Sequence, residues 1–215
     1  MKSKVSKSTP IEEFADVCMN SLIIVSFAKI ILFQKIFSIG NISFFVVTFI
    51  FMALLLSRSI AVILRAGVSI YALYLFFTEI SEKTLLFSYT LSLVIAYFGF
   101  YLIFRKALFR KNIDVEVVSN SLALAIFVKL LYSYFVQIHQ YFSLSFILTL
   151  SIIIIVLLLI PILEDLSRLV ISFFATIDVL LYLYKLSSLF TIAFLILVIV
   201  IFGSLSYRLR RTKKI

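Results

Sequence analysis

The chain has 215 residues, of which 64% are hydrophobic and 14% charged, and its mean hydropathy is +1.22. A soluble protein has about 25% charged residues, so this composition excludes an ordinary soluble domain and indicates an integral membrane protein. The net charge of +10 does not indicate nucleic-acid binding, because the cations fall in tails and turns between apolar segments. One cysteine (Cys18) and one histidine (His139) are too few for a disulfide or for a typical haem, zinc or copper site, so no metal or cofactor is expected.

Apolar segments follow one another along the chain, and a spanning helix needs about 20 such residues. The first predicted helix begins near Pro10, where Thr9, Pro10 and Glu12 have the spacing of a capping box. Its apolar part covers 21–33, and the later helices are expected at 42–56, 60–77, 85–104, 117–136, 142–163, 169–183 and 189–207. We expect Pro161 in the last turn of the sixth helix, and Glu164, Asp165 and Arg168 just beyond it.

The cations divide unequally between the two sides of such a bundle. With eight spans and both termini cytoplasmic, fourteen lysines and arginines fall on the inner side and three, Lys35, Lys83 and Lys185, on the outer side. An excess of cytoplasmic cations is typical of multi-pass membrane proteins. Merging the last two spans would place one cationic terminus outside, so the asymmetry favours eight spans with both termini in the cytoplasm.

A motif recurs at an offset of 100 residues. The segment Asp16-Val17-x-x-Asn20-Ser21-Leu22 matches Glu116-Val117-x-x-Asn120-Ser121-Leu122, and Lys29 then aligns with Lys129. A weaker match aligns Arg58 with Arg168. The alternative is chance recurrence in a composition rich in Leu, Ile, Phe and Ser.

These matches divide the single membrane domain, 1–215, into a first repeat at 1–111 and a second at 112–215. Four helices per half is an even number, so the two halves would have the same orientation in the membrane. We therefore predict an all-α, polytopic integral membrane helical bundle of about eight transmembrane helices in two parallel four-helix repeats. We expect Lys29 to superpose on Lys129 and Arg58 on Arg168.

Four ionisable residues inside the expected helices are candidate pathway residues: Lys29, Lys129, Asp178 and Arg65. Burying such a group in a bilayer costs roughly 2.5–3.5 kcal/mol, so it needs an explanation. Lys29 and Lys129 lie about eight residues from the outer ends of their helices, on the order of 12 Å deep. They could form a cationic constriction for an anion or a lipid phosphate; alternatively, each bonds a hydroxyl, a carbonyl or Asp178 and only fixes packing.

Asp178 is about eleven residues into its expected helix, near the midplane, where a carboxylate is protonated or paired. It is either a substrate or proton site or one half of an ion pair with Lys29 or Lys129. Arg65 lies about two turns from the cytoplasmic side, and we expect its side chain to extend to the phosphate headgroups.

The repeated polar residues Asn20, Ser21, Asn120 and Ser121 are candidates for hydrogen bonds between helices. The chain lacks a Gly-rich phosphate loop, a GxSxG serine motif and an HExxH zinc motif, so no catalytic residue is assigned and a non-enzymatic protein is expected.

Two functions from different classes remain. Duplication and intramembrane charges favour a transporter- or channel-like component for a small solute, with anionic and lipidic solutes among the candidates. Only four Gly and two Pro, together with minimal loops, favour the alternative, a non-catalytic subunit or an assembly or scaffold factor of a larger membrane complex. The expected partners are the lipid bilayer and either other membrane proteins or a second copy of the chain, with no nucleic acid.

The charge asymmetry generates the first testable prediction. In a Cys18→Ser background, a single cysteine introduced as Lys213→Cys should react with an impermeant maleimide only after the cells are opened, because both termini are expected in the cytoplasm. Reaction of Lys213→Cys in intact cells would contradict the eight-span topology.

Overall fold

The structure is a computed structural model that describes residues 9–34, 41–105, 115–138 and 144–212. Every regular element in these residues is helical, which confirms the all-α class. The helices are α1 (Pro10–Gln34), α2 (Asn41–Leu55), α3 (Arg58–Ile80), α4 (Thr84–Phe100) with a π-helical turn η1 (Tyr101–Arg105), α6 (Glu116–Ile138), α7 (Leu144–Leu159), α8 (Pro161–Leu186) and α9 (Leu189–Thr212).

Six helices are long and apolar enough to cross a membrane: α1, α3, α4 with η1, α6, α8 and α9. The other two, α2 and α7, contribute the shorter apolar segments Ser43–Leu55 and Thr149–Leu159. The chain is therefore a multi-pass helical membrane bundle, and the count of eight spans stays a prediction.

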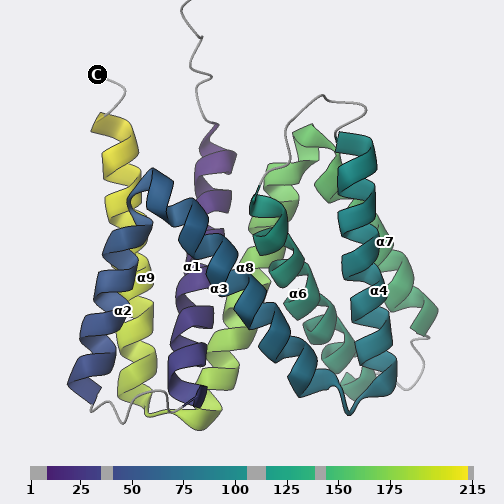
Figure 1. Cartoon of the computed structure of the whole chain (residues 1–215), viewed down its shortest axis with the longest axis horizontal. Coiled ribbons are helices and arrows are strands. Elements are labelled where there is room, and N and C mark those ends of the chain that lie inside the picture. The colour runs from purple at the N-terminus through teal and green to yellow at the C-terminus, as the bar shows by residue number, and fades with distance from the viewer. Residues whose placement is uncertain (1–8, 35–40, 106–114, 139–143, 213–215) are drawn as a thin grey trace, which may run out of the picture.

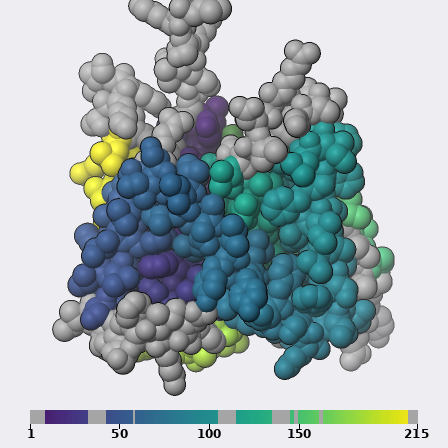
Figure 2. All heavy atoms as spheres, in the orientation of Figure 1, coloured from purple at the N-terminus to yellow at the C-terminus, as the bar shows by residue number. Residues whose placement is uncertain are grey.

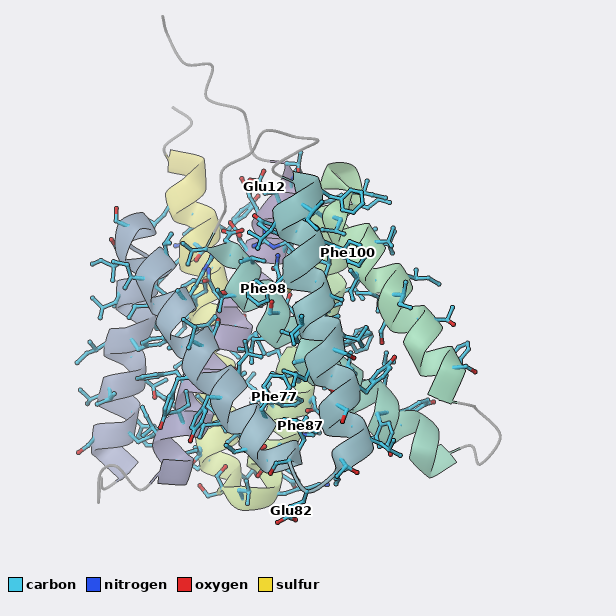
Figure 3. The ribbon with its side chains drawn as sticks, turned by 45° about the vertical axis from the view of Figure 1, so that its right-hand side comes forward. Glu12, Phe77, Glu82, Phe87, Phe98 and Phe100 are labelled. Atoms are coloured by element: carbon cyan, nitrogen blue, oxygen red, sulfur yellow. The ribbon has the colours of Figure 1, made fainter. Side chains whose placement is uncertain are left out.

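Consecutive helices run in opposite directions (Figure 1). Glu12, in the first turn of α1, and Glu82, in the turn between α3 and α4, lie at opposite ends of the bundle (Figure 3). We call these the Glu12 end and the Glu82 end. The start of α1 and the last turns of α9 both lie at the Glu12 end (Figure 1). The two termini of the bundle therefore share one side, and which side faces the cytoplasm stays a prediction.

The centre of the bundle is formed by α1 and α6. Within their spans 67% and 61% of the residues are buried, whereas the other four long spans have between 28% and 39%. Both central helices are contacted by α3 and α8, and α8 packs most extensively on α1. The outer face of α3 stays uncovered by other helices (Figure 2) and presents Ile63, Ile70 and Tyr74, as a lipid-facing surface would.

Several predicted helix boundaries are wrong, including the end of the last helix, which continues past Tyr207 to Thr212. Two of the errors concern charged residues inside the bundle. Pro161 begins α8 instead of ending the preceding helix, with Ile160 as an extended N-cap. Proline suits the first turn of a helix because it has no N–H to satisfy and its φ is already helical, and the residue before it is driven out of the helical region. As a result Glu164, Asp165 and Arg168 lie inside α8 and not in a turn.

The third helix is also longer than expected, because α3 continues past Phe77 to Ile80 and includes Glu79.

The predicted start of the first helix is confirmed. The Glu12 backbone N–H donates to Thr9 Oγ1 at 3.2 Å, and the Thr9 N–H donates to Glu12 Oε2 at 3.3 Å, the reciprocal bonds of a capping box.

Candidate functional site

The four helices α1, α3, α6 and α8 each contribute one charged side chain to a cluster near the Glu12 end. Arg65 of α3 donates from Nη1 to Glu116 Oε1 of α6 at 3.1 Å, and the same nitrogen lies 3.8 Å from Asp16 Oδ1 of α1. Arg168 of α8 lies with Nη2 2.8 Å from Glu116 Oε2 and 3.5 Å from Asp16 Oδ1. Each arginine therefore contacts both carboxylates. We call Asp16, Arg65, Glu116 and Arg168 the arginine cluster.

The arginines of this cluster are buried, and its two acids are partly exposed. Arg65 is 8% exposed and Arg168 is 4% exposed. The prediction that Arg65 extends to the headgroups is wrong. Its guanidinium instead contacts the carboxylates of Asp16 and Glu116 and the amide oxygen of Asn20. Arginine suits such a position since its five N–H donors form a planar fork that can bond several oxygens at once. A third acid, Asp165 of α8, lies 3.9 Å from Arg168 Nη1.

The asparagines of the repeated motif make contacts between helices, as expected, but the serines do not. Asn20 accepts from Arg65 Nε at 2.6 Å, and Asn120 Nδ2 donates to the Tyr97 hydroxyl of α4 at 3.2 Å. Ser21 and Ser121 instead donate to carbonyls of their own helices, those of Val17 and Val117, each at 2.8 Å.

A further pair of hydroxyls joins α3 to α6. Ser69 donates to Ser119 at 3.1 Å, and neither residue is exposed. This bond lies one turn further along α3 than Arg65, so the polar contacts between these helices continue inward from the arginine cluster.

Apolar side chains separate this polar end from the opposite end. On α1 the fully buried residues 22–25 follow Asn20, and on α6 the fully buried residues 122–125 follow Asn120. On α1 and α6 these segments form an apolar layer between the arginine cluster and the lysines. On α8 the buried hydroxyls of Ser172 and Thr176 lie between Arg168 and Asp178, and each donates to a carbonyl of its own helix.

The two lysines of the repeat lie together near the Glu82 end. Lys29 Nζ is 2.8 Å and 2.9 Å from the two carboxylate oxygens of Glu79, and Lys129 Nζ is 3.6 Å from Asp178 Oδ2. Both ammonium groups lie over the ring of Tyr182, 4.6 Å and 5.4 Å from its centroid respectively. A cation above an aromatic face is attracted by the ring quadrupole, so one tyrosine faces both cations.

A cavity of about 30 Å³ lies between these side chains, enough for one water molecule. Its polar lining consists of Ser26, Lys29, Lys129, Asp178 and Tyr182, and its apolar lining includes Leu122 and Ile126 of α6. We call it the lysine cavity. Ser26 is 3% exposed, and its hydroxyl has no hydrogen-bond partner in the described part of the chain.

Asp178 lies level with the lysines. It is eight residues before the end of α8, about 12 Å along the axis, and it lines the cavity with Lys29 and Lys129. Its depth in a bilayer stays a prediction. The expectation of an ion pair is met by Lys129, while Lys29 pairs with Glu79.

Several residues of the two sites are not predicted by the sequence. Its pattern places Glu79 and Arg168 at helix ends and gives no signal for Ser26 or Tyr182. One signal was available for the arginine cluster: Asp16 and Asn20, like Glu116 and Asn120, are four residues apart and therefore share a helix face. The arginines that bond them are far away in sequence, 152 residues in the case of Asp16 and Arg168.

Neither known protein families nor curated proteins nor solved structures give a match to this chain. Among the described residues no group of three His, Cys, Asp or Glu side chains is placed to hold a metal ion. The two sites offer charge and hydrogen bonding: a paired cluster of arginines and acids at one end, and at the other a small cavity bordered by two cations.

The second prediction concerns the arginine cluster. Arg168→Gln should lower the free energy of unfolding by about 3–5 kcal/mol, because it leaves the carboxylates of Asp16 and Glu116 with one arginine between them. By the usual conversion, the Tm should fall by roughly 6 °C or more. The Tm of Arg168→Lys should lie between those of the wild type and Arg168→Gln, because an ammonium keeps the charge but lacks the planar fork that bonds two acids.

Melting of the purified protein, followed by tyrosine fluorescence, measures these effects. The exposed residue Lys83 supplies the control, and Lys83→Gln should change the Tm by less than about 2 °C. Equal Tm values for Arg168→Gln and Lys83→Gln would show that the cluster does not support the fold.

Proposed function

We propose that this chain is a transporter- or channel-like membrane component that admits a small solute, preferably an anion, at the lysine cavity. The observation that carries the proposal is the cavity itself. It lies between the central helices, it is bordered by the ammonium groups of Lys29 and Lys129, and it contains a buried serine hydroxyl with no partner among the described residues.

The charge of the lining favours an anion. Lys29, Lys129 and Asp178 line the cavity, whereas Glu79, the partner of Lys29, is not among the lining residues. The charged side chains of the lining therefore carry one excess positive charge, which Glu79 balances from outside the lining. Lys129 is 3.6 Å from Asp178, beyond ordinary hydrogen-bond distance, so its N–H groups are available to a solute. Rings of cationic side chains are a common source of anion selectivity in pores.

Two alike halves would give such a pathway a symmetric frame, and the contacts support this part of the proposal. Arg65 and Arg168 contact the same two acids, which themselves occupy matching positions of the repeated motif. Around the arginines the segments Arg65-x3-Ser69-x2-Ala72 and Arg168-x3-Ser172-x2-Ala175 match. We therefore take Arg65, in place of Arg58, as the counterpart of Arg168; the side chain of Arg58 lies outside the described ones.

A second function, that of a non-catalytic subunit or scaffold, is favoured by a different observation. The cations of the lysine cavity have acidic partners, and the free volume is that of a single water molecule. In this alternative the charges fix helix packing and the lipid-facing surface meets other membrane proteins or a second copy. Neither function requires a catalytic group, a cofactor or nucleic acid.

The third prediction separates the two functions. Purified protein reconstituted into liposomes should release chloride or nitrate down a gradient, and Lys129→Gln should reduce the rate at least about tenfold, the equivalent of about 1.4 kcal/mol in the barrier. Lys29→Gln should act in the same direction, because both ammonium groups border the cavity. Lys83→Gln, which changes an exposed lysine near the Glu82 end, is the matched control and should leave the flux unchanged.

The scaffold function predicts another pattern for the same proteins. Wild-type vesicles would show no flux with chloride, nitrate, phosphate or a carboxylate. Lys129→Gln and Asp178→Asn would each lower the Tm, and the double variant would recover part of the loss because neither charge is then left alone. That combined result would overturn the proposal.

A further inference from the structure

The two arginines of the cluster contact the same two acids, but they differ in one hydrogen bond to an asparagine. In the first half, Arg65 Nε donates to Asn20 Oδ1 at 2.6 Å. The corresponding groups of the second half are Arg168 Nε and Asn120 Oδ1, because Asn120 matches Asn20 in the repeated motif and Arg168 shares both acids with Arg65. Among the described residues neither group has a hydrogen-bond partner.

Both unpartnered groups are inside the bundle. Asn120 is 1% exposed and Arg168 is 4% exposed. A buried polar atom without a partner destabilises the fold, so two of them beside Glu116 mark this half as incompletely bonded. They are also complementary, since Nε–H is a donor and the amide oxygen is an acceptor.

Both side chains lie near Glu116. Arg168 Nη2 already lies 2.8 Å from Glu116 Oε2, and Asn120 follows Glu116 by one turn on the same face of α6. The first half has the same arrangement, in which Asn20 follows Asp16 by one turn and Arg65 reaches both.

The side chain of Asn120 is held by another helix. Its Nδ2 donates to the hydroxyl of Tyr97, a fully buried residue of α4. This bond links α6 to α4, whereas the missing bond would link α6 to α8.

We propose that Asn120 is a two-position residue and that the bundle has a second state in which Asn120 accepts from Arg168 Nε. In the present state the Tyr97 hydroxyl holds the amide, and the two halves differ. In the second state the Arg168–Asn120 bond reproduces the Arg65–Asn20 bond, and α8 is tied more closely to α6. The contact of α6 thus passes from α4 to α8 through one amide group, independently of what the lysine cavity carries.

Removing the tyrosine hydroxyl should shift the protein to the second state. In a Tyr97→Phe background, a double-mutant cycle of Asn120→Ala with Arg168→Lys should show a coupling of about 2–4 °C in Tm, the size expected for one hydrogen bond. In the wild-type background the same cycle should show almost none. Arg168→Lys removes the Nε donor but keeps a charge beside Glu116.

The first half supplies the matched control. The cycle of Asn20→Ala with Arg65→Lys should show the coupling in both backgrounds, because that bond does not involve Tyr97. An Asn120–Arg168 coupling that is equal in the two backgrounds would overturn the proposal: equally large values would mean a bridging water molecule, and equally small values would mean that the two groups never meet.

A measurement with one conservative substitution covers the case in which the alanine variants fail to fold. In protein labelled with 15N-arginine, the Nε–H proton of Arg65 should resonate downfield of that of Arg168 in the wild type, since a hydrogen bond deshields the proton. In Tyr97→Phe both should be downfield. An Arg168 signal that is unchanged by Tyr97→Phe would contradict the second state.

Discussion

Two arginines that share two carboxylates join four helices of this bundle. A guanidinium cannot be left without partners in an apolar interior, and breaking a buried pair costs about 3–5 kcal/mol. Here the partners come from different helices: α1 supplies Asp16, α3 Arg65, α6 Glu116 and α8 Arg168. A shift of any one helix would separate at least one arginine from an acid, so the cluster fixes the relative positions of all four.

The two ends of the bundle differ because their charges are matched differently. At the Glu12 end each arginine contacts both acids, which suits a rigid junction. At the Glu82 end Lys29 is tightly paired with Glu79, whereas Lys129 is 3.6 Å from Asp178 and borders a cavity. The apolar layer at Leu22 and Leu122 lies between the ends. Beyond the lysine cavity, the side toward the arginine cluster is therefore apolar on the two central helices.

The sequence was sufficient for the helical class and for the meeting of the two lysines, because apolar length and a repeated motif are local signals. It failed where a charged residue continues a helix. Glu79 and Arg168 resemble helix ends in a hydropathy reading, yet both lie inside helices where a partner on another helix compensates the charge. Such compensation depends on pairs as distant as Asp16 and Arg168, which no local pattern contains. The hydrogen bond from Asn120 to Tyr97 of α4 could not be predicted for the same reason.

The most direct test of the shared cluster is a thermal double-mutant cycle of Asp16→Asn and Glu116→Gln. Since each arginine contacts both acids, either single variant leaves both guanidinium groups one carboxylate, whereas the double variant removes both of these shared partners. The account predicts that the Tm of the double variant falls by more than the sum of the two single losses. A loss equal to that sum would mean two independent ion pairs and would contradict the account.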